Sequence, residues 1–240
     1  MKLSERIIFA NAAVICVHKM AGELSVPDRD HHHKSQKPSE VVRRPVLGLL
    51  LQEYLGQQIF PVHRLDLPVS GLLLFAKTAA AHRDLNLAFE NGEIHKTYLA
   101  QSQVQNFDHW PMSVANPREK ILSLNDEHFQ WRNQILRGKR RAFQSAAGQK
   151  TLTMAHCFDA VVDPDGGSRL HWRLHPVTGR SHQLRFEMSY RGFPVLGDKL
   201  YGGAAVSDYS EGEIALQHHS LNFGHVKTAK KLGLPDLISL

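Results

Sequence analysis

The apolar run Leu72–Ala76 limits the possible folds more than any other segment of the chain. Five consecutive apolar residues are typical of a strand buried on both faces, because a half-exposed strand alternates apolar and polar residues. A helix is predicted directly after this strand, since Thr78 is suited to its N-cap and Gly92 to its end. The chain is therefore expected to build a sheet that is covered on both sides.

Further strands and helices are predicted without a regular βαβ order. Strands are expected at 7–10, 13–17, 96–101, 151–160 and 169–174, and helices at 46–55 and 181–191. A turn is expected at 163–167, and residues 103–150 show the weakest pattern. This irregular mixture favours an α+β fold over a doubly wound sheet.

Length and composition indicate an ordinary globular protein. The 240 residues correspond to about 1.6 average domains, so one large domain, or one domain with an appendage, is expected. Hydrophobic residues make up 42% and charged residues 22% of the chain, which excludes the disordered and membrane classes. The two cysteines, Cys16 and Cys157, lie in apolar strand-like segments, so inert thiols in a reducing compartment are expected. No signal peptide opens the chain, and we expect a cytoplasmic protein.

The excess of positive charge is concentrated in one segment. The formal net charge is +6, and residues 132–150 contain six basic side chains and no acidic one. Without those six, 23 basic residues face 23 acidic ones. Such a segment suits a polyanion, because each neutralised phosphate releases counterions. A solvated loop that only keeps the protein soluble is the alternative.

The histidines do not form a recognisable metal site in the sequence. There are 16 of them, but no H-E-x-x-H or comparable spacing occurs. Three are consecutive, at 31–33, within a polar segment expected to be a loop. Consecutive histidines do not all face one ion easily, so an adventitious or solvated tract is favoured. A metal hydrolase is therefore disfavoured.

Two polar segments next to predicted secondary structure are candidates for chemistry. Residues 61–71 form a loop directly before the buried strand and place His63, Arg64 and Asp66 on rigid structure. Residues 178–185 lead into a helix whose first turns carry arginines and an imidazole, a pattern that suits a phosphate or carboxylate. The first segment also fits an ordinary solvated loop, and the second fits an ordinary capped helix. A third candidate, residues 94–98, also fits an ordinary edge strand.

Taken in order, these segments resemble the RluA family of RNA pseudouridine synthases. His63-Arg64-Leu65-Asp66 with Ser70-Gly71 resembles the catalytic H-R-L-D-x-x-T-S-G motif, with Val69 in place of threonine. The other matching elements are Lys96-Thr97-Tyr98 for K-x-Y, Thr178–Arg185 for T-G-R-[ST]-H-Q-[LI]-R and Gly197–Gly202 for G-D-x-x-Y-G. His18–Gly22 departs from the family's N-K-P-[AS]-G. The similarity runs from about residue 7 to 223 and leaves 103–150 unmatched.

The resemblance implies a single α+β catalytic domain over residues 1–240, with a mixed, largely antiparallel sheet flanked by helices and loops. Because only six residues precede the first predicted strand, we expect no RNA-binding S4 domain of the kind found at the N-terminus of many relatives, and we expect 103–150 to be a divergent basic segment. The implied partner is RNA, and we expect a monomer that does not associate with membranes.

The resemblance also implies roles for individual residues. Asp66 would be the nucleophile at C1′ or C6, with Arg185 as the ion-pair partner that lowers its pKa. Tyr98 would stack on the uracil, and Arg64 would fill the gap left by the flipped base. The implied RNA contacts are His63, Arg64, Arg180, His182 and Gln183, to which the basic segment adds Arg137, Lys139, Arg140 and Arg141.

The implied activity is isomerisation of specific uridines in ribosomal RNA, transfer RNA or both. The reaction neither adds nor removes atoms, so no cofactor or metal is expected. Leu24-Ser25-Val26-Pro27 resembles the dual-specificity branch, which acts on both kinds of RNA. A non-catalytic RNA-binding protein that uses the same basic surface is the alternative.

Overall fold

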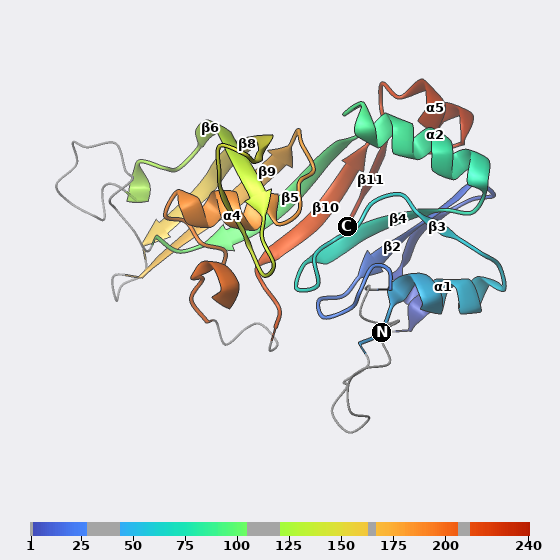
Figure 1. Cartoon of the computed structure of the whole chain (residues 1–240), viewed down its shortest axis with the longest axis horizontal. Helices are drawn as coiled ribbons and strands as arrows, with labels where there is room; N and C mark the ends of the chain where they lie inside the picture. Colours follow the sequence, from blue (N-terminus) through green and yellow to red (C-terminus); the bar gives the residue numbers. More distant parts are fainter. Residues whose placement is uncertain (1, 28–43, 105–120, 163–166, 206–211) are drawn as a thin grey trace. The chain divides into compact units, whose positions relative to one another are not determined.

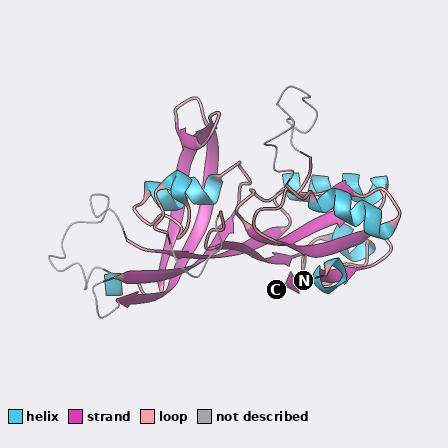
Figure 2. Ribbon diagram, turned by 90° about the horizontal axis from the view of Figure 1, so that it is seen from below, coloured by secondary structure: helices cyan, strands magenta, loops and turns pink. Residues whose placement is uncertain are grey.

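The computed structural model of the chain describes residues 2–27, 44–104, 121–162, 167–205 and 212–240. The chain forms two compact units, one of residues 1–94 with 220–240 and the other of residues 95–219. Strands dominate the second unit, whereas helices are more prominent in the first (Figure 2). No helix among the described residues is long and apolar enough to cross a membrane.

The first unit is a largely antiparallel sheet with helices on both faces (Figure 1). Strand β2 pairs with β1 and β4, β3 pairs with β4, and β11 pairs with β10. In chain order the elements are η1 (Leu3–Arg6), β1 (Ile7–Ala10), β2 (Val14–Lys19), α1 (Leu47–Leu55), β3 (Phe60–Pro61), β4 (Ser70–Ala76), α2 (Ala79–Glu90), the end of β10 (Leu216–Asn222), α5 (Lys227–Lys231) and β11 (Leu237–Ser239).

Strand β4 is the centre of the first unit's core, as its apolar run predicts. Leu72, Leu74 and Ala76 belong to a buried cluster that includes Leu85 of α2 and Ala229 of α5. The alternate side chains of β4 point to the other face, where the Phe75 ring lies against α1 at Gly48. The predicted cap of α2 is confirmed, because Thr78 Oγ1 accepts the Ala81 N–H at 3.1 Å.

The second unit is built around long antiparallel strands. Its elements are β5 (His95–Ser102), β6 (Glu127–Arg137), β7 (Ala142–Gln144), β8 (Gln149–Val162), β9 (Ser168–Pro176), α4 (Gln183–Tyr190), η3 (Lys199–Tyr201) and the start of β10. Strand β9 pairs with β5 and β8, and β6 pairs with β8 and β7. The core contains Trp131 and Trp172, whose rings lie 5.5 Å apart. The mixture of an antiparallel sheet with flanking helices confirms the α+β fold class.

Helix α4 packs against one face of these strands. Thr151 Oγ1 of β8 donates to Glu187 of α4 at 2.7 Å, and Gln183 Nε2 donates to Thr153 Oγ1 at 3.0 Å. Because successive side chains of a strand alternate between faces, Met154 and His156 lie on the opposite face. We call this side of β8, with its neighbours on β6 and β9, the exposed face of the second unit.

Two sequence predictions are corrected by the structure. The helix expected at 181–191 begins at Gln183, because His182 has a left-handed backbone with φ 57° and so ends the preceding turn. The segment 132–150 is not a flexible loop, since it contains most of β6 and all of β7. Gly148 in this segment allows close packing, since a Cβ there would lie 2.5 Å from the Ile135 carbonyl carbon.

Other predictions are confirmed or lie outside the described residues. Cys16 and Cys157 are buried and free. Burial raises the pKa of each thiol to about 12, as expected for inert cysteines. The histidines at 31–33 and most of the turn at 163–167 lie outside the described residues.

Candidate active site

Asp66 lies on the loop that joins β3 to β4 in the first unit. The loop closes in a turn, in which the Val69 N–H donates to the Asp66 carbonyl at 3.1 Å. The Asp66 side chain is half-buried. A carboxylate in such a position combines access to a substrate with a backbone that the core can hold in place.

The side chain of Lys19, on β2, holds the backbone of this loop in place. Its ammonium group donates to the carbonyls of Leu67 at 3.2 Å and Val69 at 2.7 Å, and also to Met20 at 3.0 Å. Lys19 has no exposed surface. Burial lowers its pKa to about 8, and the negative charges of Glu23 and Asp66 partly oppose this change.

The segment that follows β2 adds further contacts to the same loop. The buried Ser25 hydroxyl accepts the Leu65 N–H and donates to the Leu65 carbonyl, both at 3.1 Å. The Gly22 N–H donates to the Leu67 carbonyl at 2.9 Å. Since the residues on both sides of Asp66 are hydrogen-bonded in this way, its backbone is fixed before any substrate binds.

The other two candidates on this loop differ in their surroundings. Arg64 is exposed and so is accessible to a ligand. His63 is half-buried, its Nε2 accepts the Leu74 N–H at 3.2 Å, and its ring packs against Phe89 at 5.2 Å. These contacts give His63 a structural role in anchoring the loop to β4 and α2, and the RNA contact predicted for it gains no support from its position.

In the second unit, Gln183 ties the turn before α4 to β8. Its Oε1 accepts the Thr178 hydroxyl at 2.8 Å and the Arg180 N–H at 3.0 Å, and its Nε2 donates to the Leu152 carbonyl and to Thr153. Gln183 is 3% exposed. The amide therefore organises the turn, and its position does not support the predicted RNA contact. Arg180 is exposed on the same turn.

Arg185 of α4 is held by a residue to which the sequence analysis gave no role. Its Nε and Nη2 donate to the two carboxylate oxygens of Asp198 at 2.6 and 2.8 Å, and both side chains are buried. The guanidinium also lies 5.1 Å from the centre of the Tyr201 ring. The Tyr201 hydroxyl is 3.0 Å from His182 Nδ1 and accepts the Ala142 N–H. The orientation of the guanidinium is thus set by the G-D-x-x-Y-G segment.

Tyr98 lies on β5, and its ring stacks on the buried His218 of β10 at a centroid distance of 4.5 Å. Lys96, two residues earlier, has its ammonium group close to the backbone at Gly179. Burial lowers the pKa of Lys96. The K-x-Y segment therefore supplies an aromatic platform and a partly desolvated amine within the second unit.

The remaining predicted residues, Arg137, Lys139, Arg140 and Arg141, are exposed at the turn between β6 and β7. Sequence reasoning missed Lys19, Ser25 and Asp198 as residues that hold the candidates in place. Asp198 lies in the G-D-x-x-Y-G element that resembles the family, and Lys19 keeps the lysine of the N-K-P-[AS]-G element from which His18–Gly22 otherwise departs, so both segments contained a signal. Among the described residues, one group with metal-ligating side chains occurs, and it lies on β6, β8 and the turn before β6, outside these motifs.

Comparison with known proteins gives a consistent picture. A family model described as RNA pseudouridylate synthase matches residues 13–190. The dual-specificity RNA pseudouridine synthase RluA of Vibrio vulnificus is 31% identical over 228 residues, covering 92% of this chain and 78% of the relative. The tRNA pseudouridine synthase C of Pasteurella multocida is also 31% identical, covering 82% and 74%.

A solved structure shows the same fold. Human RNA pseudouridylate synthase domain containing 1 matches with a TM-score of 0.62 at 21% identity, covering 90% of this chain and 77% of that one. The family model covers most of the chain, and the relatives exceed 30% identity over most of their length. These findings favour an RNA-modifying isomerase over a non-catalytic RNA-binding protein, and the chain belongs to the RluA family of RNA pseudouridine synthases.

Proposed function

We propose that this enzyme isomerises specific uridines of ribosomal RNA, transfer RNA or both, with Asp66 as the nucleophile. The observation that carries the proposal is the fixed backbone around Asp66, within a loop that matches the family's catalytic motif. Relatives named for dual-specificity and for tRNA synthases are similarly distant from this chain, so both classes of RNA belong to the proposal.

The reaction breaks the N1–C1′ bond of uridine, turns the uracil and joins its C5 to C1′. The proton on C5 is lost and N1 gains one, so the atoms balance without a further reactant. We propose that Asp66 acts as an ionised carboxylate, either at C1′ or at C6 of the base. Preorganisation of the loop by Lys19 and Ser25 supports this role, because a nucleophile reacts fastest from a fixed position.

Arg185 and Tyr98 complete the proposed catalytic set. Arg185 is proposed to pair with the Asp66 carboxylate and keep it charged, as the family motif implies. The two hydrogen bonds from Arg185 to Asp198 support a positioning function, because they fix the plane of the guanidinium. Tyr98 is proposed to stack on the uracil and to assist removal of the C5 proton.

RNA binding is proposed to depend on exposed basic side chains. Arg64 is proposed to fill the space left by the flipped base, and Arg180 to contact phosphate. The turn between β6 and β7, with Arg137, Lys139, Arg140 and Arg141, is proposed to bind the RNA backbone. His182 is proposed to contact the RNA as well. His63 and Gln183 are instead proposed to hold other residues of the site in place.

We further propose that the two compact units together make one catalytic domain, since the matched residues 13–190 include parts of both. We also propose that the enzyme acts as a monomer in the cytoplasm and needs no cofactor.

The test is mass-resolved mapping of pseudouridine in ribosomal and transfer RNA from cells with and without this protein. New pseudouridines at defined positions in the presence of the protein, and none with Asp66→Asn, are expected. RNA binding without any new pseudouridine would instead support the non-catalytic alternative. The RNA that gains the modification identifies the substrate class.

A further inference from the structure

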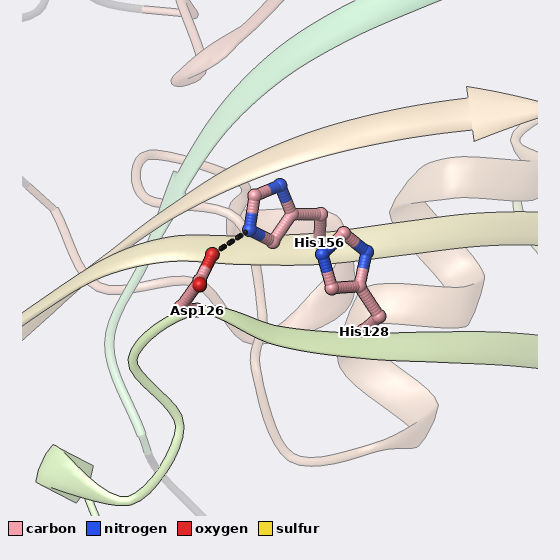
Figure 3. Close-up of side chains that lie close together, drawn as sticks. All are labelled: Asp126, His128 and His156. Carbon is pink, nitrogen blue, oxygen red and sulfur yellow. Dashed lines mark hydrogen bonds and ion pairs between the residues drawn. The ribbon is translucent and has the colours of Figure 1, made fainter.

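The exposed face of the second unit carries three metal-ligating side chains that the proposed reaction does not use. Asp126 ends the turn before β6, His128 lies on β6, and His156 lies on β8 (Figure 3). Each offers one ligand atom, and the three atoms lie within 4.8 Å of one another. We propose that Asp126, His128 and His156 bind a divalent transition-metal ion, with Zn²⁺ as the representative ion.

Strand register brings the two histidines together. His128 and His156 are direct antiparallel partners, so their side chains leave the sheet on the same face. Their rings stack with centroids 3.9 Å apart and planes inclined by 10°. Both imidazoles therefore lie next to each other on the same side of the sheet.

Asp126 is aimed at the same point by an unusual backbone. Its φ is 61°, a left-handed conformation that is uncommon for residues with a side chain, although aspartate tolerates it better than most. The result is that its Oδ1 lies 2.7 Å from His156 Nε2 (Figure 3). The carboxylate side chain is 80% exposed and His156 is 16% exposed. The ion would therefore take the place of the proton between Asp126 and His156, with one side open to water.

The ligand types select the class of ion. Zn²⁺ binds imidazole nitrogen and carboxylate oxygen at about 2.0–2.2 Å and accepts three protein ligands with water as the fourth. The three ligand atoms lie within 4.8 Å of one another, so binding requires side-chain rotation, above all of the exposed His128, to reach such distances. Mg²⁺ and Ca²⁺ prefer sites made of oxygen ligands. His128 and His156 line a shallow depression together with Arg173 and His175.

The same face provides a matched comparison site. His171 Nδ1 lies 2.8 Å from Asp159 Oδ2, which is again a histidine–aspartate pair at the surface. Among the described residues no third metal-ligating side chain joins this pair to form a cluster. If a simple surface ion pair were enough to attract an ion, the two sites would behave alike.

The experiment is calorimetric titration of the full chain with Zn²⁺, in a background where His31, His32 and His33 are replaced by alanine. That background removes adventitious Zn²⁺ binding by the consecutive histidines from the titration. One Zn²⁺ per chain is expected, with affinity reduced at least about tenfold by His128→Ala or His156→Ala, because each removes a ligand. His171→Ala should leave the affinity unchanged, and Mg²⁺ should give no stoichiometric binding.

Asp126→Asn provides a second variant with minimal change in shape, and weaker Zn²⁺ binding is expected from it as well. Circular dichroism of each variant reports whether the fold is intact. Absence of a one-to-one site in the background protein would overturn the proposal. The proposal would also be overturned if His128→Ala bound Zn²⁺ as tightly as the background protein. The same holds if His171→Ala weakened Zn²⁺ binding as much as His128→Ala does.

Discussion

The ammonium group of Lys19 donates to the carbonyl of Val69 at 2.7 Å, three residues after Asp66, from a position with no exposed surface. A buried lysine is unfavourable unless its donors find acceptors. Here the acceptors are backbone carbonyls next to the proposed nucleophile. The relationship links β2, a core strand, to the geometry of the reaction.

Replacement of Lys19 by methionine should impair both stability and catalysis. It leaves the carbonyls of Leu67 and Val69 without their donor, and each unsatisfied carbonyl costs about 1–3 kcal/mol in the free energy of unfolding. Because the loop would then no longer hold Asp66 in one position, kcat should fall by about 10- to 100-fold. Denaturant unfolding and single-turnover kinetics provide the two measurements. Lys77→Met is the control, because Lys77 donates to the Asn11 carbonyl at 2.7 Å, away from this loop.

The lowered pKa of Lys19 gives a distinct dependence on pH. Its pKa falls from 10.5 in the unfolded chain to about 8 in the folded protein. Between these values the unfolded chain binds more protons, so the contribution of Lys19 to the free energy of unfolding rises as the pH increases through this range. The stability difference between the parent and Lys19→Met should therefore grow from pH 8 to 10.5. A constant difference across that range would contradict the assignment.

Asp66→Asn should abolish isomerisation while leaving the fold and RNA affinity nearly unchanged, since asparagine keeps the shape and removes the charge. Turnover is measured by release of tritium from C5-labelled uridine, and affinity by filter binding. Asp84→Asn on α2 is a suitable control, because Asp84 is a surface aspartate paired only loosely with Arg83 at 3.9 Å. Residual turnover within about tenfold of the parent would remove Asp66 from the mechanism.

Because Arg185 forms a buried ion pair with Asp198, a substitution at Arg185 affects stability as well as catalysis. Arg185→Ala leaves a buried carboxylate without a partner, which costs about 3–5 kcal/mol and lowers activity through unfolding as well as through chemistry. Arg185→Lys keeps the charge but not the planar fork, so kcat should fall severely with a smaller decrease in stability. The control is Arg191→Lys, which changes the nearby ion pair with Glu187. Wild-type kcat in Arg185→Lys would show that bidentate geometry is unnecessary.

Local patterns predicted the elements that depend on local forces. The apolar run of β4 and the Thr78 cap of α2 follow from neighbouring residues and were found from the sequence. The β6–β7 pairing was missed because its partners are set by tertiary register, and basic residues obscure the strand pattern. Asp198 was missed as a partner for a similar reason, since it meets Arg185 from a separate segment 13 residues later. The Lys19 contacts join residues 48 and 50 positions apart, a distance at which spacing gives no guidance.

Removal of divalent ions should leave isomerisation intact. None of the proposed steps uses a metal, and the proposed Zn²⁺ ligands lie on the face of β8 opposite to α4. Turnover is compared before and after exhaustive dialysis against a chelator, with Asp66→Asn as the inactive reference. Activity that disappears on chelation and returns with added Zn²⁺ would contradict a metal-free reaction.

The turn between β6 and β7 should supply binding energy for every RNA alike. Arg137, Lys139, Arg140 and Arg141 are exposed at the end of a paired hairpin, in which Arg137 and Ala142 are cross-strand partners. A structured hairpin presents these charges at lower entropic cost than a loose loop would. Replacing the four by glutamine should reduce the slope of log affinity against log salt by about 0.7 to 0.9 for each phosphate that the protein no longer neutralises.

Catalysis at saturating RNA should be nearly preserved in that quadruple variant, because interactions made equally in the ground state and the transition state affect affinity rather than kcat. The control neutralises three lysines of α5 in the first unit, Lys227, Lys230 and Lys231, against the four charges removed from the hairpin. If the hairpin binds RNA, only the hairpin variant changes the salt slope. Parallel salt lines with equal affinities for the parent and the hairpin variant would mean that the concentrated charge faces solvent only, and RNA docking would then depend on Arg64 and Arg180.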